Sequence, residues 1–261
     1  MVADARAAPT RLRPICYDPG VRTLDISYAD PAMNLALDEA LLDAAEEGLS
    51  GETLRFWEAP APFVVIGTAQ ELAKEADEAA CAAEGVPILR RASAGGCVLQ
   101  GPGSLNYALV LIPEQRPETR TLRGSYDYIL NALAAAFAAR GIEARHEGTC
   151  DLAIGGRKVS GNAQKRRRRA FLHHGTLLYH ADPAAMARYL REPEDRPDYR
   201  GARTHGDFVA TLPLDAEALK VAVREAFGAL DTVSSPTPWE MAHAEGLARD
   251  KYRSRDWTYR R

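Results

Sequence analysis

Residues 90–111 read RRASAGGCVLQGPGSLNYALVL and combine two arginines, two glycine turns and an apolar run. Glycine lets backbone N–H groups approach a ligand that a Cβ atom would keep away. Arginine presents a planar fork of donors that suits a carboxylate or a phosphate. Arg90 and Arg91 beside the turn at 93–96 therefore indicate an anion site. The same glycine turn is equally typical of a simple hairpin.

Apolar patterns on either side of this stretch predict an interspersed set of strands and helices. Helical patterns cover 31–42, 71–84, 123–140, 183–190, 216–227 and 241–250. Strand patterns cover 23–28, 54–58, 63–67, 86–91, 105–112, 144–146, 152–154, 158–163 and 172–179. We expect the strands at 86–91 and 105–112 to pair across the glycine turn. Strands and helices without a strict β-α-β repeat are typical of an α+β domain.

Composition excludes several classes of protein. The chain has 261 residues, of which 46% are hydrophobic, and a formal net charge of −3. Nucleic-acid binders usually have a basic excess, and a membrane span needs a longer apolar run than any present. Four scattered cysteines without a CxxC pair fit a reducing cytoplasm and predict no metal site. We therefore expect a cytoplasmic protein that binds neither nucleic acid nor a membrane, with a flexible N-terminal tail over residues 1–20.

Further motifs accompany the glycine loop. Residues 149–164 read TCDLAIGGRKVSGNAQ, and residues 173–178 read HHGTLL. With RRASAGG, with NLALDEALL at 34–42 and with KYRSRDWTY at 251–259, they resemble the lipoate–protein ligases and lipoyl/octanoyl transferases, in the same order. The resemblance covers about residues 22–261. It implies the catalytic-domain fold of biotin and lipoate ligases, a mixed sheet with flanking helices akin to class II aminoacyl-tRNA synthetases.

The resemblance also implies an activity. A lipoate ligase-like catalytic domain over residues 21–261, with no C-terminal accessory domain, is expected to activate lipoate with ATP and Mg²⁺. It would transfer the lipoyl group to a lysine of a carrier domain of the 2-oxoacid dehydrogenase E2 or glycine cleavage H protein type. A separate accessory ligase chain is then a further expected partner. Two alternatives stay open: a transferase that takes octanoate or lipoate from an acyl thioester without ATP, and a non-catalytic module that binds the lipoyl carrier.

Lys158 is the expected catalytic residue. A fixed positive charge at the oxygen on which negative charge develops lowers the barrier to acyl transfer. An isolated lysine after a hairpin is usually only solvated, but GRKVSG places Lys158 at the position of the family's essential lysine. Asp151 is expected to assist proton removal from the incoming amine. Ser160 and Gly161 are expected to flank the substrate beside the lysine.

The glycine loop is expected, by resemblance, to hold the carboxyl end of the acyl group and the nucleotide phosphates. Its expected binding residues are Arg90, Arg91, Ser93, Gly95 and Gly96. Asn106 is expected to bind the nucleotide or orient the loop, and His174 to support the site or contact ligand. The sequence departs from the family at Ala94, where a glycine is usual, and at 101–103, where an acidic D-x-G turn is usual. The missing acid leaves the contacts to magnesium or ribose in doubt.

Two remaining features bear on partner and mechanism. The basic block at 165–169 is usually a solvated loop, but it would also steer an acidic carrier domain. Some octanoyltransferases of this superfamily use a cysteine nucleophile. Neither Cys150 nor Cys97 lies where that pattern places it, and the negative charge of Asp151 would discourage thiolate formation at Cys150. These observations favour the ligase over the transferase.

Overall fold

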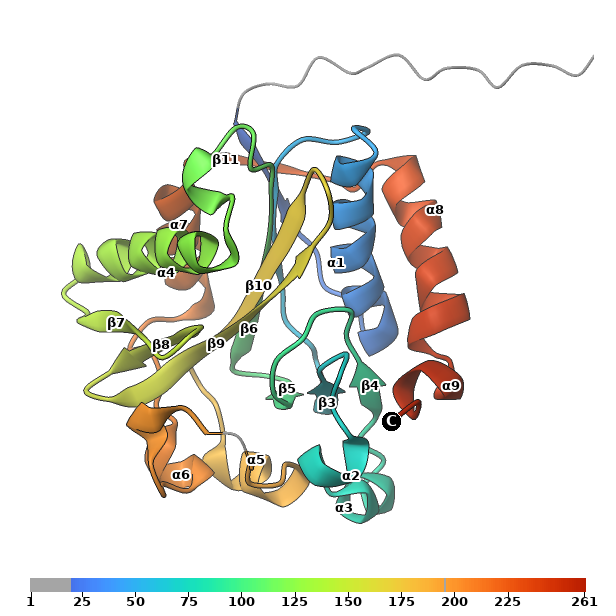
Figure 1. The fold of residues 1–261 in the computed structure, drawn as a ribbon, viewed down its shortest axis with the longest axis vertical. Helices are drawn as coiled ribbons and strands as arrows, with labels where there is room; N and C mark the ends of the chain where they lie inside the picture. The colour runs from blue at the N-terminus through green and yellow to red at the C-terminus, as the bar shows by residue number, and fades with distance from the viewer. Residues whose placement is uncertain (1–19, 195) are drawn as a thin grey trace, which may run out of the picture.

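The computed structural model describes residues 20–194 and 196–261, which form an α+β fold with two sheets (Figure 1). The large sheet has the strand order β11-β1-β2-β6-β10-β9-β8-β7. Its strands are β1 (Val21–Asp25), β2 (Thr53–Trp57), β6 (Ser104–Leu111), β7 (Ala144–Glu147), β8 (Asp151–Ile154), β9 (Arg157–Arg166), β10 (Phe171–Leu178) and β11 (Ala229–Ser234). β1 is parallel to both neighbours and the other pairs are antiparallel, so the expected mixed sheet is confirmed. The tail predicted over residues 1–20 lies outside the described residues, apart from Gly20.

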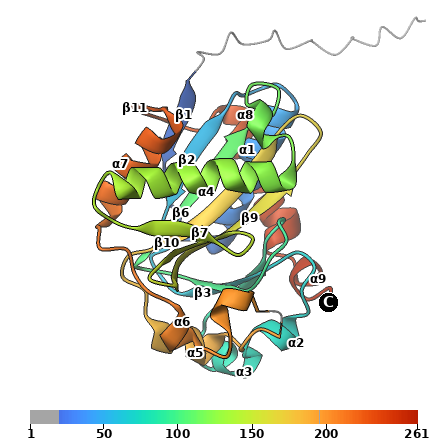
Figure 2. The ribbon, with the colours of Figure 1, turned by 60° about the vertical axis from the view of Figure 1, so that its left-hand side comes forward.

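Helices cover both faces of the large sheet (Figures 1 and 2). One face carries α4 (Leu122–Ala138) and α7 (Ala216–Phe227), and the other carries α1 (Pro31–Glu46) and α8 (Pro238–Leu247). In β6, Leu109 packs in the cluster under α4 and α7, whereas Val110 packs in the cluster under α1. Successive side chains of a strand point to opposite faces. A strand buried on both faces is therefore apolar throughout, which explains the continuous apolar run at 105–111.

The small sheet, with the order β4-β3-β5, lies at one end of the large sheet (Figures 1 and 2). Its strands are β3 (Phe63–Ile66), β4 (Ile88–Arg90) and β5 (Val98–Gln100), and the short helices near it are α2 (Leu72–Glu75), α3 (Glu78–Ala83), α5 (Pro183–Tyr189), α6 (His205–Phe208) and α9 (Arg255–Thr258). A third apolar cluster joins this sheet to α5 and α6. None of the helices in the described ranges combines the length and apolar character needed to cross a bilayer.

Two details of the predicted fold are wrong. The strand predicted at 105–112 does not pair with the one at 86–91, because β6 is held between β2 and β10 while β4 lies beside β3. The helix predicted over 71–84 is divided into α2 and α3. Ala76 is extended, and the side chain of Asp77 accepts a hydrogen bond from the N–H of Ala80, so a new helix begins there.

Candidate active site

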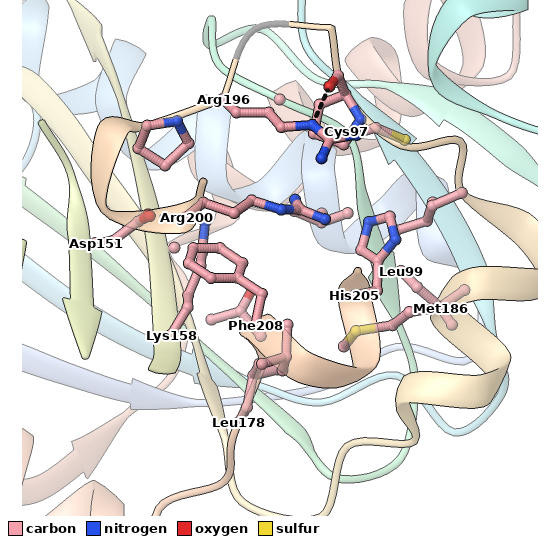
Figure 3. A pocket seen from close by; sticks show the side chains of 18 of the residues that line it. Cys97, Leu99, Asp151, Lys158, Leu178, Met186, Arg196, Arg200, His205 and Phe208 are labelled. Atoms are coloured by element: carbon pink, nitrogen blue, oxygen red, sulfur yellow. Dashed lines mark hydrogen bonds and ion pairs between the residues drawn. The ribbon is translucent and has the colours of Figure 1, made fainter. Parts of the chain in front are cut away.

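A cavity of about 370 Å³ lies where the small sheet meets the end of the large sheet. Its apolar lining residues include Val98, Leu99, Leu178, Met186, Phe208 and Val209. Its polar wall includes Cys150, Asp151 and Lys158. In Figure 3, Lys158 and Asp151 lie across the cavity from Leu99 and Met186. Other polar and charged side chains also line it, among them Arg196, Arg200 and His205. A cavity that combines apolar side chains with charged ones suits a ligand that has an apolar chain and a reactive polar end.

Lys158 and Asp151 form an ion pair on the polar wall. Nζ of Lys158 lies 2.7 Å from Oδ1 of Asp151 on the neighbouring strand. The register of β8 against β9 shifts between Leu152 and Ala153, so that Asp151 is opposite Gly161. A Cβ atom on Gly161 would lie 2.8 Å from both Cε and Nζ of Lys158. The glycine of the motif therefore leaves room for the lysine to reach its carboxylate.

Tyr199 holds the other oxygen of Asp151, a contact that no sequence pattern indicated. Its hydroxyl donates to Oδ2 over 2.8 Å, and its ring packs against Phe208 with the centroids 5.1 Å apart. Burial and the neighbouring carboxylate raise the pKa of Tyr199, so the hydroxyl remains a donor. Tyr199 lies in the 3₁₀ turn Asp198–Arg200, in a segment where the sequence patterns predict neither a helix nor a strand. Tertiary packing alone brings it to the site.

Cys150 and Cys97 both line the cavity. Burial raises the pKa of both thiols, that of Cys97 to about 12. Asp151 raises the pKa of Cys150 further, whereas the positive charges of Lys158 and Arg91 lower it. Sγ of Cys150 lies 3.9 Å from Oδ1 of Asp151. A thiol, a carboxylate and an ammonium therefore meet at one point of the cavity wall.

Arg90 and Arg91 direct their donors at the protein itself. The guanidinium of Arg90 donates to the carbonyls of Gly67, Gln70 and Thr258. The guanidinium of Arg91 donates to Oγ of Ser93 and to the carbonyls of Ala94 and Gly96. Both side chains are buried, and burial lowers the pKa of each. Arg91 thus holds the glycine loop in shape, whereas Arg90 ties together segments outside that loop. The contact of either arginine with a bound anion stays a prediction.

The other predicted binding residues divide between the cavity wall and the layer behind it. Gly96 and Gly161 line the cavity, whereas Ser93, Gly95, Asn106, Ser160 and His174 do not. Oγ of Ser93 lies 2.6 Å from Nε2 of His174. Oδ1 of Asn106 accepts a hydrogen bond from Thr176, which does line the cavity. These side chains support the wall, and their direct contact with substrate stays a prediction.

The basic block at 165–169 lies at the turn between β9 and β10, at the end of β9 remote from Lys158 (Figure 1). Arg167 pairs with Asp43 of α1 at 2.9 Å. The carboxylate of Glu46 accepts hydrogen bonds from three consecutive backbone N–H groups of the turn. Contacts with α1 thus occupy part of the block, which weakens the expectation that it docks a carrier domain.

Comparison with known proteins identifies the family. Residues 30–227 match the lipoyl protein ligase A/B catalytic domain. The chain belongs to this family. The octanoyltransferase LipM of Geobacillus kaustophilus is 30% identical to it, and the match covers 92% of this chain and 98% of that protein. A putative lipoate-protein ligase A of Aeropyrum pernix is 35% identical over 64% of this chain and 61% of that protein.

A solved structure shows the same fold. The bi-partite lipoate protein ligase of Thermoplasma acidophilum superposes with a TM-score of 0.79 at 22% identity, covering 92% of this chain and 96% of that one. The predicted fold and the predicted family are therefore confirmed, and this member of the lipoyl protein ligase A/B family is an enzyme. The names of its relatives divide between the two chemistries that the sequence left open.

Proposed function

We propose that the protein is an octanoyl or lipoyl transferase that passes an acyl group from a thioester, through Cys150, to a lysine of a lipoyl carrier domain. One observation carries the proposal. Oδ1 of Asp151 lies 2.7 Å from Nζ of Lys158 and 3.9 Å from Sγ of Cys150. The thiol of Cys150, a nucleophile, and the ammonium of Lys158, a fixed positive charge, thus lie beside the same carboxylate. The name of the Geobacillus kaustophilus relative supports the same chemistry.

In the first step Cys150 takes the acyl group from the donor. The thiol first releases its proton to give the thiolate, which is the nucleophilic form of cysteine. The sulfur then attacks the thioester carbonyl. A new C–S bond forms, the donor's C–S bond breaks, and the donor leaves as a thiol after taking up the proton. Lys158 places its positive charge at the oxygen that becomes negative. Asp151 and Tyr199 hold that ammonium in position.

In the second step the acyl group moves to the acceptor. The lysine amine of the carrier domain attacks the Cys150 thioester, so that a C–N bond forms and the C–S bond breaks. The amine loses one proton and the thiol of Cys150 regains one. The expected acceptor is a lipoyl carrier domain of the 2-oxoacid dehydrogenase E2 or glycine cleavage H protein type. With a thioester donor the reaction needs no separate accessory ligase chain.

The apolar wall of the cavity supports a medium-length acyl substrate. Leu99, Leu178, Met186 and Phe208 line the cavity, and Leu99 and Met186 lie across it from the ion pair of Lys158. Burial of an acyl chain against such side chains contributes roughly 0.8 kcal/mol for each CH₂ group. Octanoate and lipoate, each with an apolar chain and one acyl carbon, suit this arrangement.

An ATP-dependent lipoate ligase is the second candidate, because the Aeropyrum pernix relative is named a putative lipoate-protein ligase A. Such an enzyme needs donors for the phosphates and oxygen ligands for Mg²⁺. Arg90 and Arg91 are engaged with main-chain carbonyls, and the turn at 101–103 has no carboxylate. Asp151 is already engaged by Lys158. These residues fit an acyl thioester better than a magnesium nucleotide.

Acyl transfer to a carrier distinguishes the two candidates. The protein is incubated with an apo-lipoyl domain and either the octanoyl thioester of a carrier protein, or lipoate with ATP and Mg²⁺. We expect the lipoyl domain to gain one octanoyl group in the first mixture only, by intact mass. Cys150→Ser should abolish the gain, whereas Cys81→Ser, which replaces a buried thiol of α3, should retain it. Modification only in the ATP mixture would overturn the proposal.

A further inference from the structure

A chain of hydrogen bonds runs through the large sheet to the backbone of Cys150. Its members, in order, are Arg166, Gln164, His173, Tyr107 and Asn162. Nη1 of Arg166 lies 3.2 Å from Oε1 of Gln164, and Nε2 of Gln164 lies 3.1 Å from Nδ1 of His173. The hydroxyl of Tyr107 lies 3.0 Å from Nε2 of His173 and 2.6 Å from Oδ1 of Asn162. Nδ2 of Asn162 ends the chain 2.7 Å from the carbonyl oxygen of Cys150. All members except Arg166 are buried. This relay crosses strands β9, β10 and β6.

The chemistry of its two ends fixes the direction of every hydrogen bond in the relay. Arg166 can only donate, so Gln164 presents Oε1 to it and Nε2 to His173. Nδ1 of His173 therefore accepts and Nε2 donates to Tyr107. The hydroxyl of Tyr107 in turn donates to Oδ1 of Asn162. At the other end the carbonyl of Cys150 can only accept, which requires Nδ2 of Asn162 to face it. The assignment of donors and acceptors is therefore the same from either end, and every hydrogen bond of the relay points in one direction.

Gly175 makes room for the relay. A Cβ atom at this position would lie 1.8 Å from Oδ1 of Asn162 and 2.7 Å from Cε1 of Tyr107. Only glycine allows the hydroxyl and the amide to meet beside β10. Burial also lowers the pKa of His173 to about 3, so the imidazole stays neutral in the relay. Asn162 and Gln164 of the GNAQ motif thus belong to the same set of contacts as His173 and Gly175 of the HHG motif.

We propose that this relay positions Cys150 for acyl transfer, an inference that rests on the proposed function. Cys150 lies in the turn at 148–150 between β7 and β8, where the chain is less constrained than in a strand. The side chain of Asn162 ties the carbonyl of that turn to β9. The thiol then stays beside Asp151 and Lys158. Asn162, Tyr107 and His173 are positioning residues, since they act through the backbone of Cys150.

Removal of one hydroxyl tests the relay. Tyr107→Phe deletes the donor to Asn162, and we expect kcat for octanoyl transfer to fall about 10- to 100-fold with KM unchanged. Tyr252→Phe is the matched control. Its hydroxyl is equally buried and donates to Glu39 over 2.7 Å, but on the opposite side of the sheet. This control should keep the normal kcat. A kcat within twofold of the normal value in Tyr107→Phe would overturn the inference.

A second variant keeps the test decisive if Tyr107→Phe does not fold. Asn162→Ala removes the last link, and we expect a similar loss of kcat. In the double variant the loss should equal the larger single loss, because both changes cut the same relay. Losses that multiply would contradict a relay. Cys150→Ser is measured in parallel: if it retains transfer, the proposed function fails. If it abolishes transfer while Tyr107→Phe and Asn162→Ala are normal, only the relay fails.

Discussion

A Cβ atom on Gly161 would lie 2.8 Å from Nζ of Lys158, so a side chain at residue 161 would make the end of the lysine shift from its place beside Asp151. Gly161→Ala should therefore displace the ammonium and lower kcat for acyl transfer, by roughly 100-fold if the shift is about 1 Å. Gly246→Ala in α8 is the control, since the nearest atom to its added Cβ lies 3.9 Å away. This control should keep full activity. Normal kinetics in Gly161→Ala would show that the ion pair tolerates displacement.

Lys158→Ala should abolish most of the acyl transfer while leaving the fold intact. Loss of one electrostatic contact to a developing oxyanion typically costs on the order of 10²- to 10³-fold in rate. Lys220→Ala is the matched change, because it also removes a lysine that is ion-paired at 2.8 Å, with Asp25. Turnover and thermal unfolding of both variants are compared with those of the parent. Near-normal turnover in Lys158→Ala would remove the assigned role.

The reactivity of Cys150 should follow the charges around it. Burial and Asp151 raise the pKa of Cys150, so the thiolate fraction and the rate of alkylation by iodoacetamide should continue to rise above about pH 9, beyond the ordinary pKa of a cysteine. Asp151→Asn removes a negative neighbour, lowers this pKa and should speed alkylation at pH 8. Lys158→Ala removes a positive neighbour and should slow it. Peptide mass analysis identifies the alkylated residue, and equal rates in the two variants would contradict the account.

A buried ion pair should dominate local stability between α1 and β2. Nη1 of Arg55 lies 2.6 Å from Oδ1 of Asp38, with both side chains almost fully buried, and Trp57 donates to the other oxygen. Asp38→Ala should destabilise the fold by about 3–5 kcal/mol, because it leaves an unpaired buried charge. Chemical denaturation measures this change. Glu143→Ala, which removes an exposed partner of Arg145, should leave the denaturation midpoint unchanged. Equal effects of the two substitutions would contradict the dominant role of the buried pair.

The sequence predicted the hairpin that carries Asp151 and Lys158 well, because the residues that indicate it are close together in the chain. The turn at Gly155–Gly156, the strands on either side and the positions of Asp151 and Lys158 all follow from spacing within 16 residues. Tyr199 was missed, since it reaches Asp151 from a segment about 50 residues away in the chain. No pattern within that segment marks a residue that only tertiary packing brings to the site.

The surroundings of Arg90, Arg91 and Cys150 could not be predicted from the sequence, for a related reason. Sequence reasoning treated Arg90 and Arg91 as free donors because residue type shows a fork but not the carbonyls that fill it. It also counted only Asp151 against a thiolate at Cys150. In the folded chain Lys158 pairs with the same carboxylate and offsets part of that repulsion. Charge arguments from adjacent residues alone therefore misjudge a site built from two strands.

The most direct test of the central claim is to trap the acyl group on the enzyme. The protein is mixed with the octanoyl thioester of a carrier protein, without ATP and without acceptor, and its intact mass and peptides are analysed. We predict one octanoyl group on Cys150, which passes to an apo-lipoyl domain when that domain is added. Transfer that proceeds without any adduct on Cys150, or that requires lipoate and ATP, would contradict the account.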